Sequence, residues 1–149
     1  MNKKLLLAII CLLLILLMVY AAVAKFNDYY NFRAGLEESP IIAPFAGLLV
    51  WVVPVTELII AALLFLPPLR LYGLYAAFVL MLLFTIYIIV LLSFYKDIPC
   101  SCGGILEEMP WGVHIAFNSV FVLLSAWGIR LERRHRREQV VTLSLSKGA

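Results

Sequence analysis

Apolar residues gather into four long blocks along the chain. They cover residues 5–23, 44–66, 71–94 and 111–131. A helix needs about 20 apolar residues to cross the hydrocarbon layer of a membrane, and each block is long enough. The runs are too continuous for the alternating strands of a membrane β-barrel. The pattern therefore predicts an all-α integral membrane protein, a four-helix bundle in which every block spans the bilayer.

Composition agrees with this environment. Hydrophobic residues make up 64% of the 149 residues and charged residues only 14%, against about 25% charged in a soluble domain. The basic run that follows the fourth block is typical of a segment that contacts anionic lipid, so we expect no nucleic-acid partner. We expect residues 1–131 to form the membrane domain and residues 132–149 to form a basic cytoplasmic tail that frays.

The first block also resembles a secretory signal. Lys3 and Lys4 precede it, and Ala22-Val23-Ala24 follows with the small residues of a cleavage site. A signal has an apolar core of about 7–15 residues, and this block is longer. The length favours a retained membrane helix, with cleavage as the alternative.

Basic residues in the connections predict the orientation, because Lys and Arg resist export. The more basic side carries Lys3, Lys4, Arg70, Arg130, Arg133, Arg134, Arg136 and Arg137, whereas the other carries Lys25, Arg33 and Lys96. We therefore expect both termini on the cytoplasmic side of the membrane. Segments 24–43 and 95–110 would face outward.

The first of these outer segments has a helical pattern of its own. Phe26, Tyr29, Tyr30, Arg33 and Leu36 recur at helical spacing before a Ser39-Pro40 break. The spacing predicts a short interfacial helix with an aromatic face at headgroup depth. It would either roof the bundle or simply set its depth.

The second outer segment carries Cys100-Ser101-Cys102, preceded by Pro99 and followed by two glycines. A disulfide needs α-carbons about 4.4–6.8 Å apart, which a bent backbone allows here. So short a bridge is strained and exchangeable, which favours a redox role over a structural one. The alternatives are an inert disulfide and a Cu(I) site with His114. Cys11, within the first block, is expected to be packing.

Polar residues inside the blocks are the other candidates. His114, Asn118 and Ser125 fall on one face of the fourth helix and predict a polar stripe turned into the bundle. His114 would assist proton transfer or only join two helices. Glu57 needs a partner in hydrocarbon, and Thr85, Tyr87 or Arg70 could supply one. Signatures of phosphate loops, haem ligands and metalloproteases are absent from the sequence, which argues against nucleotide chemistry.

Taken together, these features resemble the MauE/DoxX-like family of redox-associated membrane proteins, over residues 25–131. The resemblance rests on Ser39-Pro40, the segment 53–58, Arg70 with Gly73-Leu74, the segments 84–87 and 99–104, and Trp111 with His114 and Phe117-Asn118. It implies a four-helix bundle. In the methylamine-related members it also implies a part in forming or delivering disulfides to an exported enzyme. The Cys-Ser-Cys pair departs from the two-residue spacer of thioredoxin-type motifs.

The leading hypothesis is a membrane thiol-disulfide redox protein with Cys100, Cys102 and His114 as its catalytic residues. Its partner would be an exported thioredoxin-like protein. The sequence assigns no cofactor with certainty; a quinone is the candidate, with Asn118 and Glu57 as candidate contacts, and no resident metal is expected. The rivals are a non-catalytic component that holds a redox partner and a copper-handling protein.

Overall fold

The computed structural model describes residues 3–94 and 110–147, and all regular structure within these ranges is helical. The helices are listed in chain order: α1 (Lys3–Asn27), α2 (Tyr29–Glu38), the 3-10 turn η1 (Ala43–Phe45), α3 (Ala46–Phe65), α4 (Arg70–Phe94) and α5 (Trp111–Lys147). Four of them are long and apolar enough to cross a membrane, with α3 continuing from η1. The predicted all-α membrane bundle is confirmed.

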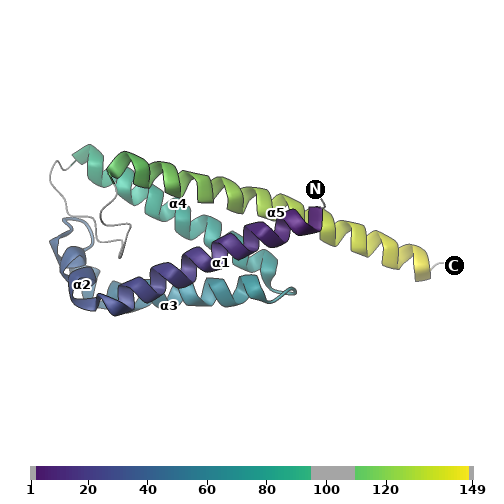
Figure 1. The fold of residues 1–149 in the computed structure, drawn as a ribbon, viewed down its shortest axis with the longest axis horizontal. Helices are drawn as coiled ribbons and strands as arrows, with labels where there is room; N and C mark the ends of the chain where they lie inside the picture. The colour runs from purple at the N-terminus through teal and green to yellow at the C-terminus, as the bar shows by residue number, and fades with distance from the viewer. Residues whose placement is uncertain (1–2, 95–109, 148–149) are drawn as a thin grey trace.

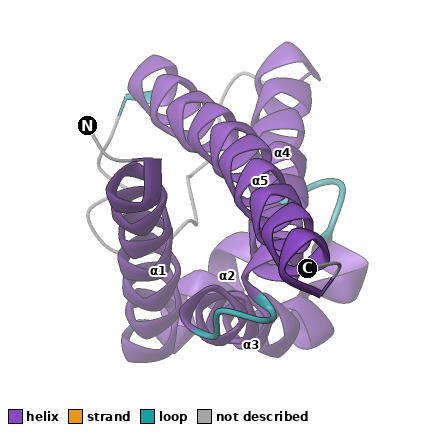
Figure 2. Ribbon diagram, turned by 90° about the vertical axis from the view of Figure 1, so that its right-hand side faces the viewer, coloured by secondary structure: helices purple, strands orange, loops and turns teal. Residues whose placement is uncertain are grey.

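The four long helices pack side by side in a ring. α1 contacts α3 and α5, and α4 contacts the same two helices from the other side (Figure 2). α2 lies at one end of the bundle beside the beginning of α3, and α5 protrudes from the opposite end near the N-terminus (Figure 1). We call these the α2 end and the basic end.

Apolar side chains fill the bundle and also cover its outside. The core joins all four long helices through residues such as Leu14, Ile60, Leu74 and Ile129. Large apolar side chains are also exposed on every long helix, including Leu16, Ile59, Leu83 and Leu123. A surface of this kind is stable in lipid and not in water. The chain is therefore a multi-pass protein of a lipid bilayer.

α4 crosses α3 closely near the basic end, where Gly73 faces the end of α3. A β-carbon on Gly73 would lie 2.8 Å from the backbone nitrogen of Leu64. Ala77, one turn further along, is fully buried. The Gly73 and Ala77 spacing thus marks a close helix crossing.

Two helices extend past their predicted bounds. α1 continues to Asn27 instead of ending at residue 23, and α5 continues to Lys147 instead of ending at residue 131. Beyond residue 131 the chain has no proline or glycine before Gly148, and Glu132 pairs with Arg136 one turn later. Helix formation therefore does not stop where the apolar block stops. The division into a membrane domain and a tail stays a prediction.

α2 is the short helix expected after the first span, although its buried face differs from the predicted one. Phe32 and Leu36 pack against the beginning of α3, whereas Tyr30 is exposed. Tyr29 contacts Trp51 of α3, with ring centroids 5.6 Å apart. The helix therefore rests on α3 through an apolar stripe, and its aromatic residues lie on more than one side.

Candidate functional site

Cys100 and Cys102 lie outside the described residues, so their geometry stays a prediction. Their segment connects Phe94, at the end of α4, with Trp111, at the start of α5. Both helix ends lie at the α2 end of the bundle (Figure 1). The described polar residues of that half therefore lie at the same end as the two helix ends to which this segment is attached.

A buried ion pair joins α1 to α3. The Nζ of Lys25 lies 2.9 Å from Oε1 of Glu57, and the two side chains are 5% and 1% exposed. Lys25 also donates to the carbonyl of Ala21 at 3.3 Å and lies 5.7 Å from the centroid of the Phe32 ring. Oε2 of Glu57 has no hydrogen-bond partner among the described residues. The pair is held in place, and one carboxylate oxygen keeps an unused acceptor.

The partners predicted for Glu57 were wrong. The Thr85 hydroxyl donates to the carbonyl of Met81 at 2.7 Å, and Arg70 begins α4 at the basic end. Tyr87 instead shares a 2.7 Å hydrogen bond with the Ser39 hydroxyl. That bond ties the residue after α2 to the last third of α4.

The sequence did not predict the inward position of Lys25, because the first apolar block ends at residue 23 and Lys25 was assigned to the outer segment that follows. α1 in fact continues past it, and Lys25 falls on the buried face of that helix, after Met18, Ala21 and Ala22. Its long apolar stem brings the ammonium group across to α3. The four-residue spacing from Ala21 was a signal that could have indicated this inward position.

The polar stripe of α5 is turned into the bundle, as predicted. His114 and Asn118 are 2% and 4% exposed, and Ser125 is fully buried. The Ser125 hydroxyl donates to the carbonyl of Phe121 at 2.8 Å. α5 packs mainly on α4 and α1, whereas the ion pair lies between α1 and α3. The stripe of α5 is therefore a buried polar set distinct from the ion pair, and the functional roles of both stay predictions.

α2 carries an exposed ion pair close to the ring contacts. Arg33 Nε lies 2.8 Å from Oε1 of Glu37, one helical turn later. This hydrogen bond, together with a smaller contribution from Tyr29, raises the pKa of Arg33 above its ordinary value. Arg33 is charged at physiological pH even without this shift, so its pairing with Glu37 is an ordinary surface ion pair of α2.

Potential metal-ligating side chains do not cluster in the described part of the chain. Residues 3–94 and 110–147 contain no group of three or more His, Cys, Asp or Glu side chains that could hold an ion. Cys100 and Cys102 fall between these ranges, so the copper alternative stays a prediction.

Comparison with known proteins identifies the family. The model of the methylamine utilisation protein MauE matches residues 3–131, which include the first three spans, the first part of the fourth and the Cys-Ser-Cys segment. No curated protein and no solved structure matches the chain. A match over most of the sequence, together with the four apolar helices, establishes the family. The chain belongs to the family of the methylamine utilisation protein MauE.

Proposed function

We propose that this protein exchanges disulfides with an exported thioredoxin-like partner through Cys100 and Cys102. The observation that carries the proposal is the Cys-Ser-Cys pair in the connection between α4 and α5 of a MauE family chain. A strained bridge is a good exchanger and a poor crosslink. The proposal places the pair outside the inner membrane of a bacterium, with both termini in the cytoplasm.

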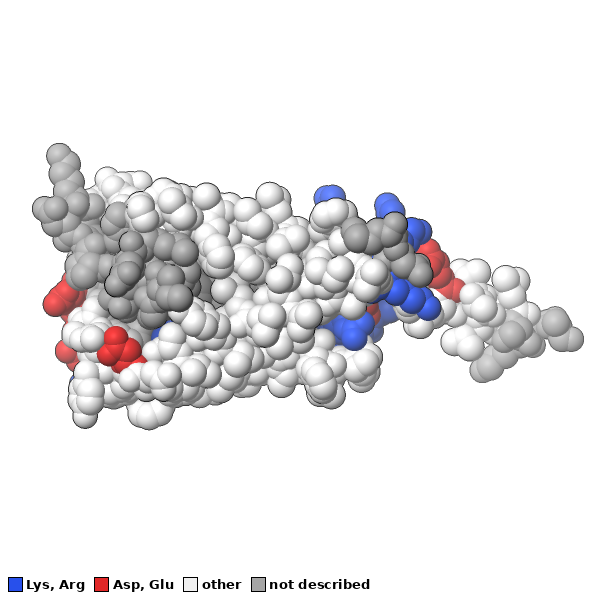
Figure 3. Space-filling model, in the orientation of Figure 1, with Lys and Arg blue, Asp and Glu red and all other residues white. Residues whose placement is uncertain are grey.

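The charge distribution supports this orientation. On the face drawn in Figure 3, Lys and Arg gather at the basic end, near the start of α1 and the protruding part of α5. At the α2 end, Lys25 is buried in its ion pair with Glu57, and Arg33 is paired with Glu37. The excess of basic residues at one end is what the positive-inside rule associates with the cytoplasm.

The exchange step is a pair of thiolate displacements. A thiolate of the partner attacks one sulfur of the Cys100–Cys102 bridge, which breaks that bond and forms a mixed disulfide. The second thiolate of the partner then attacks the mixed disulfide, so that the partner leaves oxidised. Cys100 and Cys102 keep the two electrons and take up two protons as a dithiol. The reverse sequence would reduce the partner, and the proposal does not choose between the directions.

His114 is the proposed proton carrier for this step. It lies in the first turn of α5, on the buried face and at the end where the cysteine segment joins that helix. An imidazole can take up and return a proton near neutral pH. Asn118 and Glu57 as cofactor contacts, and a quinone as electron acceptor, stay predictions from the sequence.

Trapping tests the proposal directly. In a Cys11→Ala background, Cys102→Ala and Cys100→Ala are expressed separately, and exported proteins are examined for a mixed disulfide. Without its resolving thiol, the remaining cysteine should hold the partner in a complex that a reductant releases. At least one single variant is expected to give this complex, whereas the double variant gives none.

The redox state of the unmodified pair provides the second measurement. Alkylation before and after reduction should find both dithiol and disulfide forms in cells. If neither variant captures a partner and the pair never changes state, exchange is excluded and the non-catalytic role is favoured. Copper retained by the reduced pair, with no captured partner, would favour the copper-handling alternative.

A further inference from the structure

A pocket at the basic end of the bundle has no part in the proposed exchange. Its volume is about 420 Å³, within the range of about 300–1,000 Å³ that is typical of small-ligand sites. The first turn of α1, the turn between α3 and α4, the start of α4 and the middle of α5 all contribute to its lining. Segments far apart in the sequence thus build one concave site.

The lining carries an excess of positive charge. Lys4, Arg70 and Arg136 contribute three cationic side chains, with His135 beside them, against the single carboxylate of Glu132. That carboxylate is already paired with Arg136. Lys4 and Arg70 therefore have no acidic neighbour of their own in the lining.

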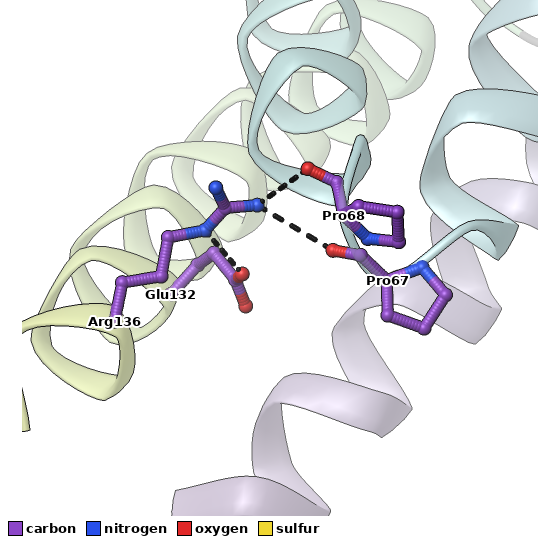
Figure 4. A network of polar contacts seen from close by, with 4 residues as sticks. All are labelled: Pro67, Pro68, Glu132 and Arg136. Carbon is purple, nitrogen blue, oxygen red and sulfur yellow. Dashed lines mark hydrogen bonds and ion pairs between the residues drawn. The ribbon is translucent and has the colours of Figure 1, made fainter. Parts of the chain in front are cut away.

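Arg136 is held in a fixed orientation (Figure 4). Its Nε lies 2.9 Å from Oε1 of Glu132, and its Nη2 donates to the carbonyls of Pro68 at 2.9 Å and Pro67 at 3.4 Å. These contacts attach α5 to the turn between α3 and α4. They use the Nε and Nη2 hydrogens and leave those of Nη1 for a ligand or solvent.

Arg70 provides the observation that points to a ligand. Its Nε is buried and has no hydrogen-bond partner in the described part of the chain. A cationic N–H group that has lost water without gaining an acceptor is costly. Arg70 also lines the pocket, and the arginine fork matches phosphate oxygens well, so a small turn of the guanidinium toward a bound phosphate would give the Nε donor an acceptor.

We infer that this pocket binds a phosphate group, supplied by the headgroup of an anionic phospholipid. α3 ends and α4 begins beside the pocket, so it lies where two spans leave the hydrocarbon layer. Phe65, Leu66 and Leu69 are exposed at the same turn and offer an apolar surface to acyl chains. Basic pockets between membrane helices are known to accept anionic headgroups. The inference is independent of the exchange chemistry.

Lipid binding by the purified full-length protein tests it. Native mass spectrometry from a neutral detergent would compare retention of phosphatidylglycerol with that of phosphatidylcholine. Wild type is expected to prefer phosphatidylglycerol. Arg70→Gln and Lys4→Gln should each weaken that binding at least about fivefold, the scale of one lost Lys or Arg contact to an anionic lipid. Lys4 is exposed, so its variant does not endanger folding.

Arg134→Gln is the matched control, because it removes one charge from the same part of α5 at an exposed position outside the pocket lining. It should retain wild-type binding. Equal retention of both lipids, or an equal loss in all three variants, would overturn the inference. Inorganic phosphate is the second probe. Competition with phosphatidylglycerol would support a shared phosphate site, whereas binding of phosphate alone would overturn the lipid as its source.

Discussion

Lys25 and Glu57 place opposite charges inside a bundle whose interior is mostly apolar. Each would be costly alone, because removing an ion from water is only partly offset inside a protein. At 2.9 Å the two charges compensate each other, while Oε2 of Glu57 keeps an unused acceptor. The pair is therefore a contact between α1 and α3 in which one carboxylate oxygen still has an unused acceptor.

Single and double substitutions separate a structural role of the ion pair from a functional one. Lys25→Met or Glu57→Met leaves the other charge buried and should destabilise the protein by about 3 kcal/mol, measured by thermal unfolding in detergent. The double variant should recover most of this loss, because no unpaired charge remains. Additive losses would mean that the two residues are not coupled. A double variant that is stable but fails in the trapping assay would assign the pair a functional role.

At the scale of helices, a close contact between α3 and α4 depends on the missing side chain of Gly73. α4 approaches the end of α3 so closely that a β-carbon there would meet the backbone at Leu64. Backbone atoms cannot move aside as a flexible side chain can. The position of α4, and with it the turn that carries Pro67 and Pro68, thus depends on this glycine.

Gly73→Ala and Gly47→Ala make a matched pair of variants. Both glycines are helical, but a β-carbon on Gly47 would meet nothing within 4 Å. Gly47→Ala should be neutral or stabilising by up to about 1 kcal/mol from helix propensity. Gly73→Ala should destabilise by about 1–3 kcal/mol because the helices must separate. Thermal unfolding of the two proteins checks this, and similar shifts of the same sign would contradict the crossing geometry.

At the scale of the whole molecule, basic residues gather at one end of the bundle, and the helix ends that carry the cysteine segment lie at the other. The basic end contains Lys3, Lys4, Arg70 and the continuation of α5, including the contact of Lys3 with Glu138 at 3.7 Å. The α2 end contains His114 and the two ends to which the cysteine segment is attached. The proposed thiol chemistry and the inferred phosphate site therefore lie at opposite ends of the bundle.

Thiol labelling in intact cells tests the proposed orientation. After reduction, a reagent that cannot cross the membrane should label Cys100 and Cys102 before the cells are broken. The control is Thr142→Cys in a protein whose cysteine pair is replaced by alanine, because Thr142 is exposed on the α5 continuation at the basic end. It should react only after lysis. The reverse order of labelling would place the termini outside.

The inward position of the polar residues on α5 could be predicted from the sequence. The spacing of His114, Asn118 and Ser125 indicated one inward face, because helical periodicity alone determines which residues share a side. The partner of Glu57 was not predictable in this way, since periodicity within α3 says nothing about which neighbouring helix lies opposite. The chemistry at Cys100 and Cys102, both outside the described residues, remains a prediction.

The sequence by itself determined that this protein lies in a membrane as four helices, because length and apolar composition decide that question locally. It also indicated which end is basic. The tertiary structure decided that Lys25 reaches Glu57, that Gly73 allows α4 onto α3, and that Lys4, Arg70 and Arg136 share a pocket. Those features depend on distances between helices that are far apart in the sequence. Such distances follow from packing all the helices together, which no single segment encodes.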